Sequence, residues 1–130
     1  MEKRRVVITG MGAITPIGNS VAETWESIKA GKSGIDTITH FDASINKVHY
    51  AAEVKNFDPA LYMDAKDARK MARFSQYAVA ASKMALEDAN LLGNAEILED
   101  TGCILGVGIG GFEVTEANCI SYYKSGCVKT

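Results

Sequence analysis

The hydrophobic positions of the first half of the chain predict a strand, a turn and a helix. Residues 5–10 form a β-branched run that a glycine ends, and such a run without polar alternation is typical of a strand covered on both faces. After an irregular Gly- and Pro-containing turn, residues 20–23 are typical of a capping box that opens a helix, which Gly31 would end. One apolar stripe of this helix would lie on the sheet. Residues 32–58 predict loops around a small β-element at 49–54.

The second half of the chain predicts a long helix, a second buried strand and a final helix. From about Lys66 to Leu92, apolar residues recur at steps of three or four, and many of them are alanines that permit close backbone packing. Gly93 is its stop signal. Residues 101–107 again form a run typical of a buried strand, and a helix over 112–125 follows, terminated by Gly126. This alternation predicts an α/β fold with a mainly parallel sheet.

Composition and charge favour one soluble globular domain that covers residues 1–130. The chain is 47% hydrophobic and 23% charged, and its net charge of -2 gives no general attraction to nucleic acid or to an anionic membrane. The longest uncharged stretch, residues 101–112, is far shorter than the ~20 apolar residues that a membrane span needs. Three cysteines and no apolar signal-peptide core indicate a reducing, cytoplasmic location.

Two glycine-rich segments are candidates for close approach to a ligand. In the first, Gly10 and Gly12 follow a strand as in a dinucleotide site, but Thr15 stands where the third glycine belongs and the helix begins only at Ser20. We therefore rank nucleotide binding behind a purely structural turn. In the second, residues 106–111 alternate glycine at the end of a strand. Tight packing and a pocket wall both explain this pattern.

The cysteines and histidines give little sign of catalysis. A nucleophilic cysteine needs a nearby base or a helix N-terminus to lower its pKa. Cys103 lies in a predicted strand, Cys119 lies in the middle of a helix, and Cys127 follows a helix end, so all three are expected to be inert. His40 and His49 lack the spacing of metal ligands. We expect neither a metal nor a cofactor.

A basic cluster is the most informative charged feature. Four cations at i, i+3, i+4 and i+7 would share one face of the long helix, near the positive end of its dipole; they are Lys66, Arg69, Lys70 and Arg73. One interpretation is a solvated face with local ion pairs. The other is a docking surface for an acidic partner. Arg73 is flanked by core positions, so an alternative for this residue is that it turns inward.

The order of short motifs along the chain resembles a known family. These motifs are RRVVITGMG at residues 4–12, TPIGN at 15–19, Trp25, GKSGI at 31–35, Phe41 with Asp42, RKMARFSQYA at 69–78 and GIGG at 108–111. Together they resemble the opening of the β-ketoacyl-acyl-carrier-protein synthases, the condensing enzymes, and within them the synthase II type. The resemblance covers essentially the whole chain.

The resemblance implies a thiolase-like α/β fold with layers in the order αβαβα, of which this chain is an incomplete first half, usually in a homodimer. It implies an acyltransferase that elongates fatty acids by decarboxylative Claisen condensation of malonyl and acyl carrier proteins. The family's catalytic cysteine and two histidines match positions beyond Thr130, so we expect the 130-residue chain alone to be inactive and to leave apolar faces uncovered. A chain-length-factor-like partner of a polyketide synthase, which lacks that cysteine, is the alternative.

The resemblance also implies two sites within the chain. Ile109 matches a position that borders the acyl-chain pocket near the dimer interface. Lys66, Arg69 and Lys70 match basic positions that receive the acidic face of acyl carrier protein, and Lys129 matches one member of a second basic pair. Val128 stands where the other member of that pair is expected.

Overall fold

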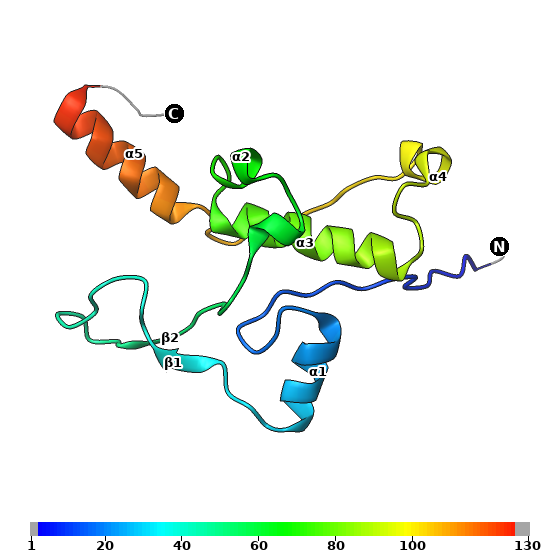
Figure 1. The fold of residues 1–130 in the computed structure, drawn as a ribbon, viewed down its shortest axis with the longest axis horizontal. Helices are drawn as coiled ribbons and strands as arrows, with labels where there is room; N and C mark the ends of the chain where they lie inside the picture. Colours follow the sequence, from blue (N-terminus) through cyan, green and yellow to red (C-terminus); the bar gives the residue numbers. More distant parts are fainter. Residues whose placement is uncertain (1–2, 127–130) are drawn as a thin grey trace.

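The computed structural model describes residues 3–126, which form five α-helices, one 3-10 helix and two short strands. The elements in chain order are α1 (Val21–Lys29), β1 (Ile35–Thr37), β2 (Tyr50–Ala52), η1 (Pro59–Leu61), α2 (Ala65–Ala68), α3 (Arg73–Asp88), α4 (Ala95–Glu99) and α5 (Phe112–Ser125). Figure 1 shows α3 in the middle, with α1 and the two strands on one side and α5 projecting at one end.

Helix α1 begins with the capping interactions that its sequence predicts. The Ser20 side chain accepts a hydrogen bond from the Glu23 N–H at 3.1 Å, and the Glu23 carboxylate accepts one from the Asn19 N–H at 2.8 Å. The helix ends at Lys29, and Gly31 follows in the left-handed region with φ of 63°. Trp25 is 58% exposed, so the expected packing of this helix on a sheet is not present in the part of the chain that the structure describes.

The small β-element is an antiparallel pair of strands. Tyr50–Ala52 forms β2, inside the predicted range, and pairs with Ile35–Thr37 so that Ile35 lies opposite Ala52. An ion pair of 2.7 Å between the Lys55 Nζ and the Asp36 carboxylate lies beside the pair. This is the one sheet that residues 3–126 form.

The single long helix predicted for residues 66–92 is wrong, because the chain forms two helices there. Helix α2 ends at Ala68, and α3 begins only after Ala72, whose ψ of 153° is extended. At its other end α3 stops at Asp88, and Asn90 adopts φ of 56°, so the helix ends before the predicted glycine. A period of three to four residues continued across the break because both helices contribute apolar positions in phase, and periodicity alone does not detect such a break.

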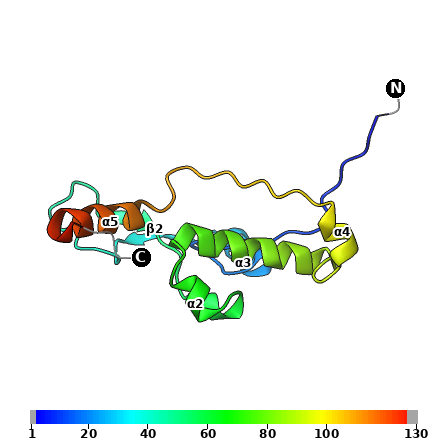
Figure 2. The ribbon, with the colours of Figure 1, turned by 90° about the horizontal axis from the view of Figure 1, so that it is seen from above.

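The two predicted buried strands are also not formed. Residues 5–10 and 101–107 are extended but unpaired, and their side chains are exposed, with Ile104 at 97%. Figure 2 shows the segment between α4 and α5 running along α3 but set apart from it over most of its length. A strand needs a neighbour to receive its N–H and C=O groups. Neither segment has one among residues 3–126.

A close backbone contact connects the N-terminal segment to α3. A Cβ added to Gly10 would lie 2.6 Å from the Ala89 nitrogen, and one added to Gly12 would overlap the carbonyl group of Ala81. The Met11 N–H also donates to the Asp88 carboxylate at 2.9 Å. The glycines therefore serve packing against the second half of α3, which supports the structural turn over a phosphate site.

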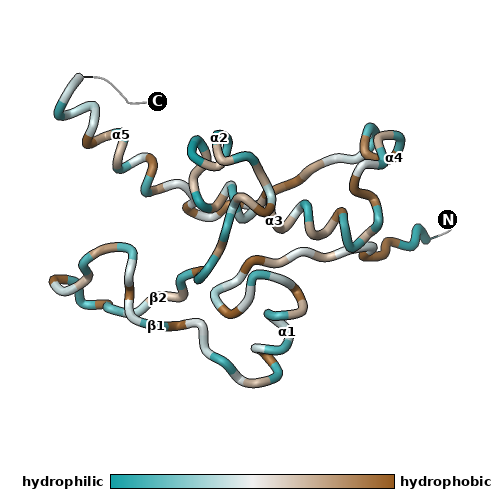
Figure 3. The backbone as a smooth tube through the Cα atoms, viewed as in Figure 1, coloured by the Kyte–Doolittle hydropathy of each residue, from teal (hydrophilic) through white to brown (hydrophobic). Residues whose placement is uncertain are grey.

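The chain exposes an unusually large total surface, and many large hydrophobic side chains contribute to it. Its accessible surface is 10715 Å², whereas a compact monomer of this length exposes about 6,700 Å². Among the described residues, the buried hydrophobic side chains are those of Ala43, Ala68 and Ala80. Figure 3 shows hydrophobic colour on the N-terminal segment and on the segment that leaves α4. The expectation that apolar faces stay uncovered is confirmed for residues 3–126.

Replacing Gly12 with alanine should destabilise the fold, because the new Cβ would collide with the Ala81 carbonyl and push the N-terminal segment away from α3. We expect the free energy of unfolding to fall by about 1–3 kcal/mol. Urea unfolding followed by circular dichroism measures this. Gly102→Ala is the matched control, since a Cβ at Gly102 would meet no atom within 4 Å. Equal effects of the two substitutions would contradict the close contact.

Candidate functional site

The basic cluster lies at the break between α2 and α3. Lys66 lies in the last turn of α2, Arg69 caps its carboxyl end and Lys70 follows, and all three are exposed. The expectation that they crowd the positive end of a long helix is therefore wrong. Helix α2 is a single turn of four residues, so these cations do not lie at the positive end of a long helix dipole. We call Lys66, Arg69 and Lys70 the basic patch.

The side chain of Gln76 holds the backbone beneath the basic patch. Its amide nitrogen donates to the carbonyl oxygen of Ala68 at 2.7 Å and to that of Met71 at 3.2 Å, and Ala68 is buried. The Ala68 carbonyl also accepts from the Met71 N–H at 3.3 Å, so Gln76 adds a second bond there and supplies one to the Met71 carbonyl in the link. Gln76 was not predicted from the sequence, because the residue has this role only where α2 and α3 separate.

Arg73 does not belong to the basic patch. Its guanidinium Nη1 lies 3.2 Å from the His40 Nε2, and its backbone N–H donates to the Glu113 carboxylate at 3.3 Å. The residue remains exposed, but its contacts run toward the loop before β2 and toward α5. The expectation that Arg73 turns inward is therefore wrong, although its contacts lead away from the other three cations.

Glu53 organises the loop that carries His40. Its carboxylate accepts hydrogen bonds from the Thr39 hydroxyl at 2.7 Å, from the Thr39 N–H at 3.1 Å and from the His40 N–H at 3.2 Å. The pKa of the Glu53 carboxyl lies below its ordinary value, mainly because the carboxylate accepts the hydrogen bond from the Thr39 hydroxyl. The His40 ring accepts from Arg73, while its 3.9 Å separation from Glu53 is too long for a hydrogen bond.

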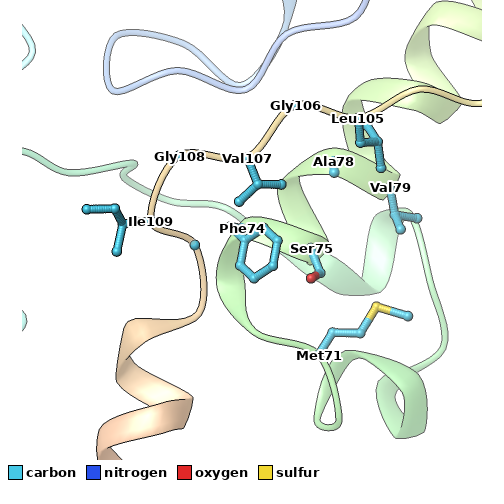
Figure 4. A pocket seen from close by; sticks show the side chains of 11 residues that line it. Met71, Phe74, Ser75, Ala78, Val79, Leu105, Gly106, Val107, Gly108 and Ile109 are labelled. Atoms are coloured by element: carbon cyan, nitrogen blue, oxygen red, sulfur yellow. The ribbon is translucent and has the colours of Figure 1, made fainter.

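An apolar hollow of about 610 Å³ lies between the first turns of α3 and the glycine-rich loop of residues 105–110. Its apolar side chains, shown in Figure 4, are those of Met71, Phe74, Ala78, Val79, Leu105 and Val107. Ile109 is among the residues at its edge, but its side chain is 86% exposed and points away from Phe74 and Ser75. The place of Ile109 in an acyl pocket stays a prediction.

The two explanations for the glycine-rich loop apply to different glycines. A Cβ at Gly110 would lie 2.7 Å from the Phe74 Cγ, so this glycine is required by tight packing. Gly111 has φ of 75° and caps the amino end of α5, where its left-handed backbone favours glycine. A Cβ at Gly106 or Gly108 would meet nothing within 4 Å. These two line the hollow instead.

The remaining candidates show no catalytic arrangement. Cys103 lies in an exposed coil and Cys119 is exposed in the middle of α5, so neither is at a helix N-terminus. Cys127 and Lys129 lie outside the described residues. Over residues 3–126, no cluster of three or more His, Cys, Asp or Glu side chains is arranged to hold a metal ion. In the same range, no helix combines the length and the hydropathy that crossing a bilayer requires.

Comparisons with known proteins agree on one family. The model of the family described as "Beta-ketoacyl synthase, N-terminal domain" matches residues 3–127. The 3-oxoacyl-(acyl-carrier-protein) synthase 2 of Synechocystis sp. is 46% identical over 116 residues, which are 89% of this chain and 28% of the relative. That of Vibrio cholerae is 49% identical over 116 residues, with the same two coverages. These findings confirm the resemblance.

A solved structure gives the same answer for the fold. The chain superimposes with a TM-score of 0.77 and 33% identity on a chain of the ishigamide ketosynthase/chain length factor, covering 97% of this chain and 31% of that one. The predicted thiolase-like α/β fold class is confirmed by this match, even though residues 3–126 do not form the parallel sheet. The chain spans less than a third of the length of these relatives.

Acidification should remove the contribution of Glu53 to stability. Because the folded-state pKa is lowered, the ionised carboxylate stabilises the fold above the ordinary value of about 4.3, and this contribution is lost as the pH falls through the lowered value. Glu53→Gln should therefore unfold at lower urea concentration than the unsubstituted protein at pH 7, and the two should converge toward pH 3. A difference that stays constant from pH 7 to pH 3 would contradict this. Glu26→Gln, which removes an exposed carboxylate paired with Lys29, is the control.

Proposed function

Because this chain belongs to the β-ketoacyl synthase family, we propose that it works as part of the N-terminal domain of a 3-oxoacyl-acyl-carrier-protein synthase. The observation that carries the proposal is the similarity, along nearly the whole chain, to relatives named 3-oxoacyl-(acyl-carrier-protein) synthase 2. Such an enzyme is an acyltransferase that extends a fatty acyl chain with carbons from a malonyl group. The proposed setting is a cytoplasmic homodimer that acts without a cofactor.

The proposed reaction has two stages. A cysteine thiolate first takes the acyl group from its carrier as a thioester and releases the carrier thiol. Malonyl carrier then loses carbon dioxide, and the resulting carbanion attacks the enzyme thioester to give the 3-oxoacyl product and free the cysteine. We assign no nucleophilic role to Cys103 or Cys119, since both lie away from helix N-termini. The residues of this chain contribute carrier docking and part of the acyl pocket.

The basic patch supports the docking part of the proposal. Three exposed cations lie within five positions of one another, and the two bonds from Gln76 fix the backbone that carries them. No salt bridge joins any of the three to a carboxylate in the described part of the chain, which leaves their charge available to an acidic partner. Lys129, which lies outside the described residues, is the proposed member of a second basic contact with the carrier. A locally positive surface attracts an acidic carrier despite a net charge of -2.

A chain-length-factor-like partner of a polyketide synthase is the second candidate. The match to a chain of the ishigamide ketosynthase/chain length factor favours it, but at lower identity than the synthase relatives. The two candidates differ in one chemical respect. A condensing enzyme carries an acyl group on a cysteine during turnover, whereas a chain-length factor lacks that nucleophile.

Incubating the full-length protein with acyl carrier protein should add one acyl group to it, because the first stage stores the acyl chain as an enzyme thioester. Intact-mass spectrometry should show this gain, and malonyl carrier should then discharge it as a 3-oxoacyl product. The variant Cys103→Ser/Cys119→Ser is the control and should retain full acylation. Decarboxylation of malonyl carrier without any acylation would favour the second candidate and overturn the first.

Reversing the charge of the basic patch should weaken carrier docking mainly by slowing association. We expect Arg69→Glu/Lys70→Glu in the full-length protein to lower the association rate constant about tenfold at low salt, with a smaller effect at high salt. Stopped-flow measurement with a fluorescent carrier protein tests this. Lys32→Glu/Lys47→Glu makes the same change of net charge at exposed positions in the links between α1 and β1 and between β1 and β2, which Figure 1 shows away from α2. An unchanged rate in the first variant, or an equal loss in both, would reject the docking site.

A further inference from the structure

We infer that Phe74 is a positioning residue for the wall of the acyl pocket, and that it influences the acyl-chain length the enzyme accepts. Its ring packs against the glycine-rich loop that carries Ile109. A change at Phe74 would therefore alter the acyl-chain specificity through the position of Ile109, and not only the stability of the fold. The inference rests on the proposed function, because it takes Ile109 to border the acyl chain. No direct contact between Phe74 and the substrate is required.

The main observation is the fit between the Phe74 ring and two consecutive glycines. A Cβ added to Gly110 would lie 2.7 Å from Cγ and 2.8 Å from Cδ1 of the ring, and one added to Gly111 would lie 3.0 Å from Cε1. The loop backbone therefore lies directly against the ring. Figure 4 shows Phe74 on the side of the loop opposite to the Ile109 side chain.

A second contact holds the same two elements together. The Arg73 N–H donates to the Glu113 carboxylate at 3.3 Å, which ties the first residue of α3 to the first turn of α5. Gly111 lies between the loop and α5 with the left-handed φ of 75° that a side chain rarely adopts. The carboxyl end of the loop is thus fixed by two adjacent residues of α3.

The rest of the loop has little other support. Gly106 and Gly108 have open space where a Cβ would be, and Leu105, Val107 and Ile109 are all exposed. Within residues 3–126, the side-chain atoms nearest to a Cβ at Gly110, the residue after Ile109, are those of Phe74 and of Val107 in the loop itself, so Phe74 is the contact that ties this point of the loop to α3. A smaller side chain at Phe74 would allow the loop to move toward α3.

Such a movement has a defined direction. Because the Ile109 side chain points away from Phe74 and Ser75, a shift of the loop toward the Phe74 ring withdraws that side chain from the space on its other side. If that space holds the end of the acyl chain, the pocket becomes deeper. The kcat/KM for longer acyl donors should then rise relative to that for shorter ones.

The test compares the condensing activity of full-length variants with acyl carriers of medium and long chain length. For Phe74→Leu, we expect the ratio of kcat/KM for the long donor over that for the medium donor to rise roughly threefold or more. Ile109→Trp, which adds bulk at the proposed wall, should lower the same ratio. Hydrogen exchange of residues 108–113 should be faster in Phe74→Leu.

Met71→Ala is the matched control. Met71 lines the same hollow and is 36% exposed like Phe74, and the two substitutions remove the same number of side-chain heavy atoms. Met71 is not among the atoms nearest to a Cβ at Gly110 or Gly111. This variant should therefore keep the donor ratio of the unsubstituted enzyme, whereas a purely structural role would make the two variants behave alike.

The outcomes separate the inference from the proposed function. If the long-to-medium ratio of kcat/KM changes in Ile109→Trp but not in Phe74→Leu, only the positioning role of Phe74 is overturned. An unchanged ratio in Ile109→Trp would overturn the pocket wall itself. Absence of any condensation by the unsubstituted protein would overturn the proposed function. Phe74→Met, which keeps an apolar side chain of similar length, provides the same comparison if Phe74→Leu does not fold.

Discussion

Close approach of glycine backbone to α3 is the constraint on which the arrangement of the chain depends. At the carboxyl half of α3, Gly10 and Gly12 lie against alanines, and at its amino end Gly110 and Gly111 lie against Phe74. At the carboxyl half, small residues on both partners allow the backbones to meet, whereas at the amino end the two glycines leave room for the Phe74 ring. Segments far apart in the sequence are thereby attached to one helix, although the described chain has few buried side chains.

The break before α3 has a functional consequence as well as a structural one. A continuous helix would present the basic patch at its positive end, where cations repel the free N–H groups. The observed break places the patch on the single turn of α2 and on the link that follows it, and Gln76 donates to one carbonyl oxygen in each of these two parts. Without a long helix dipole acting on it, the patch can remain positive until a partner binds. This is a simpler account of its stability than tolerated repulsion.

Local signals in the sequence were enough to predict some elements and not others. The capping residues of α1, the termination of α5 at Gly126 and the region of β2 were predictable because each depends on a few adjacent residues. The break at residues 69–72 was not, since the apolar period continues across it and the side chain that compensates the break lies four residues further on. The strands expected at 5–10 and 101–107 need partners that residues 3–126 do not provide. Family motifs indicated the basic patch and Ile109, but the roles of Gln76 and Phe74 became visible only in three dimensions.

The first turn of α3 carries two residues, Phe74 and Gln76, whose contacts lie on different sides of the helix. Phe74 and Gln76 are two positions apart, and residues at that spacing face different sides of a helix. One side chain therefore supports the glycine-rich loop, while the other supports the basic patch, without the two sharing a contact. A change in the loop need not alter the patch, because the hydrogen bonds of Gln76 run to α2 and its link, and the ring of Phe74 packs toward α5. If the patch binds the carrier and the loop bounds the acyl chain, one helix end aligns both parts of the same substrate while allowing each to vary independently.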